Sequence, residues 1–123
     1  MVINCILIED EPLAIRQISQ YVNGNSGLKL ECVITDMDEF YTSISDFQPR
    51  ILFLDYCIPG ALNIKKLLVQ IPKNTIIVIT SVLPLIVFPK IEDDLSKFKY
   101  VELNKPFSAE TFNNCIDRII DAL

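Results

Sequence analysis

Five short runs of isoleucine, valine and leucine recur along the chain and predict β-strands. They cover residues 3–8, 28–34, 51–54, 76–79 and 100–103. In several runs the apolar residues occupy successive positions instead of alternating ones, which is typical of strands covered by helices on both faces. The pattern therefore predicts a parallel sheet between two helical layers.

Apolar residues at helical spacing fill the segments between these runs. Pro12 suits the first turn of a helix that ends at residues 23–25, which read Asn-Gly-Asn. Asp36 and Glu39 resemble a capping box in front of a second helix. The remaining helical pattern consists of Ile64, Leu67, Leu68 and Ile71 in a third helix and, after Ser108 as N-cap, Phe112, Cys115, Ile116, Ile119, Ile120 and Leu123 in the last one.

The fourth connection is the exception, because residues 81–91 contain two prolines and little helical periodicity. We expect only a short or distorted helix there, between Ile91 and Phe98. Strand and helix otherwise alternate along the chain, and right-handed crossovers turn this order into a doubly wound, five-stranded parallel α/β sheet. We assign residues 1–123 to one domain.

The amino-acid composition excludes several classes of function. The chain has 123 residues, of which 50% are hydrophobic, so it can bury a core without disulfides or a structural metal. Its formal net charge of −5 argues against direct binding to nucleic acid or an acidic membrane. The sequence contains no histidine, which excludes imidazole bases and Ser-His or Cys-His dyads. Any chemistry must use carboxylates, lysine or the backbone.

Four cysteines stand far apart without a CxxC pair: Cys5, Cys32, Cys57 and Cys115. Each lies in or beside an apolar run, so we expect reduced core residues. The first residues lack the basic segment of a signal peptide, and no apolar run is long enough to cross a bilayer. These features predict a protein of the reducing cytoplasm that has no membrane partner.

Charged and hydroxyl residues follow four of the predicted strands, at the edge where open α/β sheets collect functional groups. Carboxylates at roughly 4 Å repel by on the order of 4 kcal/mol at an effective dielectric of about 20, so they need a counter-charge. A hard divalent cation with oxygen ligands, Mg²⁺ in particular, would supply it together with Lys105. The strand-end groups are Glu9-Asp10-Glu11, Asp55, Thr80-Ser81 and Asn104-Lys105-Pro106.

Four ordered motifs resemble the receiver domain of bacterial two-component response regulators. They are Glu9-Asp10, Asp55 with Pro59-Gly60, Thr80, and Lys105-Pro106-Phe107. The opening residues 6–14, ILIEDEPLA, look most like receivers that precede LytTR-type DNA-binding domains. The resemblance covers the whole chain and implies the flavodoxin-like receiver fold.

For the site, the resemblance implies a phosphoacceptor and a magnesium centre. Asp55 would take a phosphoryl group from a sensor histidine kinase or a small acyl phosphate, and Thr80 and Lys105 would contact the acyl phosphate. Such a transfer needs in-line positioning and charge neutralisation but no strong base. The groups that would hold Mg²⁺ are Asp10, Asp55, the main-chain carbonyl of Cys57 and, through water, Glu9.

As a whole, the resemblance implies a phosphoprotein of a two-component system that switches a partner or an output surface. It implies no enzyme activity beyond self-phosphorylation and autodephosphorylation. DNA binding and regulation of transcription would need an output domain absent from this chain. The resemblance is also compatible with a homodimer.

Departures from the receiver pattern keep an alternative open. Glu102 stands where receivers usually carry an aromatic switch residue, and Tyr100 is a substitute on the same strand face. Residues 82–99 are longer and richer in proline than the usual fourth connection. The alternative is a receiver-like interaction module that docks its partner regardless of phosphorylation. A flavodoxin-like cofactor site is disfavoured by the three acids after the first strand, and a magnesium-dependent phosphatase by the lack of an acid two residues after Asp55.

Overall fold

The computed structural model describes residues 2–123, in which five parallel strands form one sheet in the order β2-β1-β3-β4-β5. The strands are β1 (Ile3–Ile8), β2 (Leu28–Ile34), β3 (Ile51–Leu54), β4 (Ile76–Ile79) and β5 (Lys99–Glu102). The strand order reverses beside β1, so the predicted doubly wound sheet is confirmed. The fifth strand begins one residue earlier than predicted, because Lys99 pairs with Ile76 and Glu102 with Ile79.

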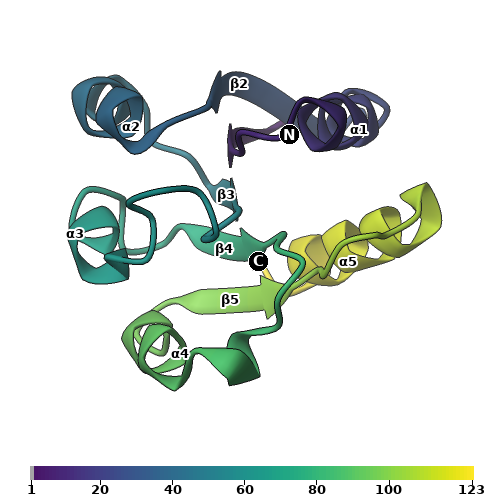
Figure 1. The fold of residues 1–123 in the computed structure, drawn as a ribbon. Coiled ribbons are helices and arrows are strands. Elements are labelled where there is room, and N and C mark those ends of the chain that lie inside the picture. Colours follow the sequence, from purple (N-terminus) through teal and green to yellow (C-terminus); the bar gives the residue numbers. More distant parts are fainter. Residues whose placement is uncertain (1) are drawn as a thin grey trace.

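Helices cover both faces of the sheet (Figure 1). On one face lie α1 (Pro12–Asn23) and α5 (Ala109–Asp121), and on the other lie α2 (Met37–Ser43), α3 (Ile64–Leu68) and α4 (Pro89–Leu95). Two short 3₁₀ turns complete the chain, η1 (Ile44–Asp46) after α2 and η2 (Leu85–Val87) before α4.

Each face of the sheet has its own hydrophobic core. In β3, Leu52 and Leu54 pack towards α2, α3 and α4, whereas Ile51 and Phe53 pack towards α1 and α5. Every residue of β3 and β4 is buried. Consecutive apolar residues in these strands are therefore explained by burial on both sides.

Local capping fixes three helix starts as the sequence predicts. Pro12 is the first residue of α1, and the Glu11 carboxylate before it accepts from the amides of the first turn. The Asp36 carboxylate accepts from the amide of Glu39 at 2.8 Å at the start of α2. Ser108 caps α5 by accepting from the third helical amide at 3.1 Å.

The fourth connection holds a short helix, as predicted, but its bounds differ from the prediction. The helix begins at Pro89, because a proline without an amide hydrogen suits the first helical position, and it ends at Leu95. The turn η2 in front of it buries Leu85 fully and leaves Ile86 79% exposed. The ends of two other helices are also earlier than predicted, since α3 stops before Ile71 and α5 before Leu123.

The cysteine prediction is corrected in part. All four cysteines are free, and Cys5 and Cys115 are buried, but Cys32 is only half-buried and Cys57 is exposed. Cys57 lies in the turn after β3 and is exposed between two buried neighbours, Tyr56 and Ile58. Among residues 2–123, no helix is long and apolar enough to cross a membrane.

Candidate functional site

The predicted site residues lie beyond the carboxyl ends of β1, β3, β4 and β5, which meet at one edge of the sheet. Hydrogen bonds between neighbouring segments continue past the strand ends. The amides of Asp55 and Lys105 donate to the carbonyls of Ile8 and Ser81 at 3.0 and 3.2 Å. Sheet pairing therefore fixes the backbone positions of the site residues before any ligand binds.

Three carboxylates gather at this edge. Glu9, Asp10 and Asp55 each place a carboxylate oxygen within 4.8 Å of the others. Glu9 is fully buried and Asp55 is 7% exposed, whereas Asp10 faces solvent. One Glu9 oxygen accepts from the amides of Asp10 and Glu11, both at 3.2 Å, so the turn after β1 holds this carboxylate in place.

Lys105 supplies the positive charge among these acids. Its ammonium contacts Glu9 Oε1 and lies 3.0 Å from Asp55 Oδ2. Burial by itself would lower the pKa of Lys105, but the hydrogen bonds to Glu9 and Asp55 raise it above its usual value. Burial raises the pKa of Glu9, and the contact with Lys105 offsets only part of that increase. Lys105 therefore stays charged between the two carboxylates.

Asp55 accepts hydrogen bonds on both carboxylate oxygens. Oδ1 accepts from the amide of Cys57 at 2.9 Å and from the hydroxyl of Ser81 at 2.8 Å, and Oδ2 accepts from Lys105. Burial would raise the pKa of Asp55, but the Cys57 amide, the Ser81 hydroxyl and Lys105 together lower it. Asp55 is thus an ionised carboxylate held from three segments of the chain.

The two adjacent hydroxyl residues after β4 have different surroundings. Thr80 is fully buried, and its hydroxyl has no hydrogen-bond partner among the described residues. Ser81 is also buried, and its hydroxyl both donates to Asp55 and accepts from the amide of Tyr56 at 3.1 Å. The sequence prediction placed both residues at the strand end but gave a role to Thr80 alone. The one signal for Ser81 was its place beside Thr80 at a strand end.

The donor set of this site fits a hard cation. The three carboxylates offer oxygen atoms, and the Cys57 carbonyl accepts no hydrogen bond from another backbone amide in residues 2–123. Partial desolvation of its sulfur and the nearby Asp55 carboxylate raise the pKa of the Cys57 thiol, so the thiol stays protonated and is a poor ligand although the residue is exposed. Oxygen-only coordination with few carboxylates is what Mg²⁺ favours in proteins.

The segment between β4 and α4, residues 82–88, is tied to the site by two side chains. The Tyr56 hydroxyl donates to the Leu83 carbonyl, and the Tyr56 ring meets Phe88 edge-on at 5.3 Å between centroids. The Glu102 carboxylate accepts from the amide of Leu85 at 3.0 Å. Glu102 therefore anchors η2 by a hydrogen bond.

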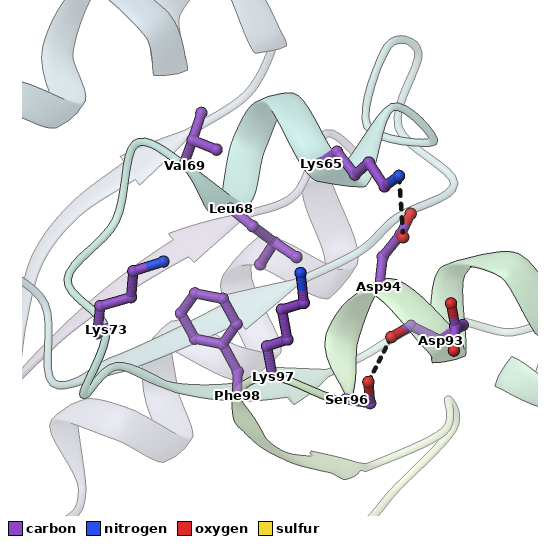
Figure 2. A pocket seen from close by; sticks show the side chains of 9 residues that line it. All are labelled: Lys65, Leu68, Val69, Lys73, Asp93, Asp94, Ser96, Lys97 and Phe98. Carbon is purple, nitrogen blue, oxygen red and sulfur yellow. Dashed lines mark hydrogen bonds and ion pairs between the residues drawn. The ribbon is translucent and has the colours of Figure 1, made fainter.

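A hollow lies at the opposite edge of the sheet, between α3 and α4 (Figure 2). It measures about 450 Å³, and Lys73 and Lys97 lie on either side of the ring of Phe98. Lys65 pairs with Asp94 at 3.9 Å on its rim. It contains no residue that the sequence prediction singled out, and its lining precedes β4 and β5 instead of following them. The predicted site residues therefore lie at the other edge of the sheet, with the three carboxylates, and not in this hollow.

Comparison with known proteins bears on the fold. No family model and no curated protein matches the sequence. Solved structures do match, among them NtrX from Brucella abortus, with 21% identity, a TM-score of 0.78 and 99% of this chain covered. CheY4 of Vibrio cholerae, a chemotaxis response regulator, gives 15% identity, a TM-score of 0.76 and 97% coverage. A CheY-like receiver domain from Methylobacillus flagellatus has 16% identity and a TM-score of 0.76, and the match covers 97% of this chain.

These similarities show that the chain has the fold of response regulator receiver domains. The chain spans 99% of the CheY4 and Methylobacillus chains but only 28% of NtrX. The fold predicted from the strand and helix order is thus confirmed. At such low sequence identity the comparisons establish the fold alone. What the site can do must be argued from its own residues.

Proposed function

We propose that residues 1–123 are a receiver domain of a two-component system that accepts a phosphoryl group on Asp55. One observation supports this function most directly. Asp55 is an ionised carboxylate at the strand edge, with Lys105 at 3.0 Å and two further carboxylates beside it. An ionised carboxylate can attack phosphorus without losing a proton, so the lack of histidine is no obstacle.

The transfer requires one bond to form and one to break. A carboxylate oxygen of Asp55 forms a bond to phosphorus, and the bond from phosphorus to the donor breaks with its electron pair leaving on the donor. The Lys105 ammonium contacts the transferred group and balances its charge. The Thr80 hydroxyl is free to donate to a phosphoryl oxygen, because it has no partner in the described part of the chain.

We assign Mg²⁺ as the cofactor of this site. Asp10, Asp55 and the Cys57 carbonyl would hold it, with Glu9 acting through water, and it would neutralise charge on the phosphoryl oxygens. The exposure of Asp10 leaves one ligand open to solvent, as an exchangeable cation requires.

The partners follow from the same proposal. The natural donor is a sensor histidine kinase, and the place is the cytoplasm, where the four free cysteines would stay reduced. Regulation of transcription would act through a DNA-binding output domain, of the LytTR type by sequence resemblance, or through a homodimer. The domain itself transforms no separate substrate.

The test is intact-mass spectrometry after incubation with acetyl phosphate and Mg²⁺. We expect a gain of one phosphoryl group in the unaltered chain and in Asp93→Asn, an exposed acid on α4. Asp55→Asn and an EDTA control should gain none. Uptake by Asp55→Asn, or no uptake by a folded unaltered chain, would overturn the assignment. Uptake without any change in oligomer or partner affinity would favour the interaction module instead.

A further inference from the structure

Ser81 stands at the junction of three segments of the site. Its hydroxyl lies 2.8 Å from Asp55 Oδ1 and 3.1 Å from the amide nitrogen of Tyr56, and its carbonyl accepts from the amide of Lys105 at 3.2 Å. The residue has no solvent exposure. A buried serine thus connects the turn after β3 with Lys105 in the segment after β5.

The direction of these hydrogen bonds is fixed by their partners. The Tyr56 amide can only donate, so the Ser81 oxygen accepts from it, and the single hydroxyl proton is left for the Asp55 carboxylate. The Cys57 amide donates to the same Oδ1 at 2.9 Å, and Lys105 donates to Oδ2. Together these donors define the plane in which the carboxylate lies.

We propose that Ser81 is a positioning residue for Asp55, whose hydroxyl holds the carboxylate in the orientation from which it attacks phosphorus. This inference rests on the proposed phosphoacceptor function and adds a residue to it. Ser81 differs from Thr80 in its role, since the Thr80 hydroxyl is unpartnered and available to the incoming group, whereas the Ser81 hydroxyl is already engaged. A carboxylate that loses one of its fixed donors samples other rotamers, and such misplacement slows a transfer that depends on alignment.

The experiment compares initial rates of phosphoryl uptake from acetyl phosphate, with Mg²⁺ and a reductant, by intact-mass spectrometry. Ser81→Ala removes the hydroxyl, and Ser81→Cys fills the same space with a much weaker donor. Ser96→Ala is the matched control, because its exposed hydroxyl bonds to the Asp93 carbonyl at the opposite edge of the sheet. We expect Ser81→Ala and Ser81→Cys to react about tenfold more slowly than the unaltered chain and Ser96→Ala to match it.

The cysteine variant separates positioning from packing. A structural role for Ser81 requires only that its space be filled, so a Ser81→Cys variant as fast as the unaltered chain would overturn the inference. Equal rates for Ser81→Ala would overturn it as well. Thermal unfolding of each variant shows whether it is folded, and Ser81→Cys decides the question if Ser81→Ala is not. No uptake by the unaltered chain would instead overturn the proposed function and this inference with it.

Discussion

Lys105 neutralises two buried carboxylates at once, which makes it the residue most costly to remove from the acidic edge. Its side chain is 16% exposed, and those of Glu9 and Asp55 are 0% and 10% exposed. We expect Lys105→Met to lower the free energy of unfolding by about 3 kcal/mol at pH 7, because it leaves Glu9 charged and unpaired inside the protein. Urea denaturation in EDTA measures this loss, with the exposed Lys97→Met as control.

The same variant should lose less stability at pH 5 than at pH 7. Without Lys105 the pKa of Glu9 rises further, since that contact is what lowers it, and a proton then removes the buried charge. An equal loss at both pH values would show that the missing contact is packing along the lysine stem and not the ion pair.

Glu9 itself is expected to destabilise the fold when it is charged. Its pKa in the folded chain is raised above 4.5, so its favourable contribution is present below that pH and is lost as pH rises through the folded value. Glu9→Gln stays neutral throughout, and we expect it to be more stable than the unaltered chain by roughly 1 kcal/mol at pH 7.5 and equal to it at pH 4. Urea denaturation in EDTA at both pH values checks this, and a less stable variant at pH 7.5 would contradict it.

At the scale of the element, η2 has one face inside the core and one in solvent. Leu85 is fully buried against the core of α2, α3 and α4, whereas its neighbour Ile86 is 79% exposed. We expect Leu85→Ala to cost 2–5 kcal/mol, roughly the usual range for a buried leucine, and Ile86→Ala to cost almost nothing. Chemical denaturation of both variants measures the difference. A similar cost for both would mean that residues 82–88 pack differently from this structure.

The elements differ in how far the sequence predicts them. β1 to β4 were predicted to the residue. The apolar runs of β1, β3 and β4 are almost entirely buried, whereas β2 is an edge strand that buries only its two end residues and was found from its apolar and β-branched residues between polar turns. The start of α4 was not predicted, although Pro89 suits a first helical position, because residues 81–91 show little helical periodicity. The turn η2 in front of it is held by a contact distant in sequence, between Glu102 and the Leu85 amide. The local apolar pattern therefore predicts the strands, whereas contacts distant in sequence determine the position of residues 82–88.

The sequence likewise predicts one part of the candidate site and not another. The strand-end positions of Glu9, Asp55 and Lys105 follow from the sheet topology, so their meeting could be predicted. The sequence could not predict which of the two adjacent hydroxyls faces Asp55. Successive side chains point in opposite directions, and the twist of the strand decides between Thr80 and Ser81. The exposure of Cys57 was missed for a related reason, since its neighbours Tyr56 and Ile58 in the same turn are buried and the apolar pattern does not show which of the three side chains points outward.

The whole molecule combines an acidic edge with a net charge of −5, so a cation that binds there should stabilise the entire fold. A ligand that binds only the folded chain raises its stability in proportion to the logarithm of ligand concentration above Kd. We therefore expect the unfolding temperature to rise steadily with added Mg²⁺, relative to NaCl of equal ionic strength. Asp10→Asn should abolish the rise, because it removes the exposed ligand. Its own stability in EDTA should be no lower than that of the unaltered chain, because the Asp10 carboxylate takes part in no hydrogen bond or ion pair within residues 2–123 and its loss removes a repulsion with Glu9 and Asp55. An undiminished rise in Asp10→Asn would place the cation elsewhere on the molecule.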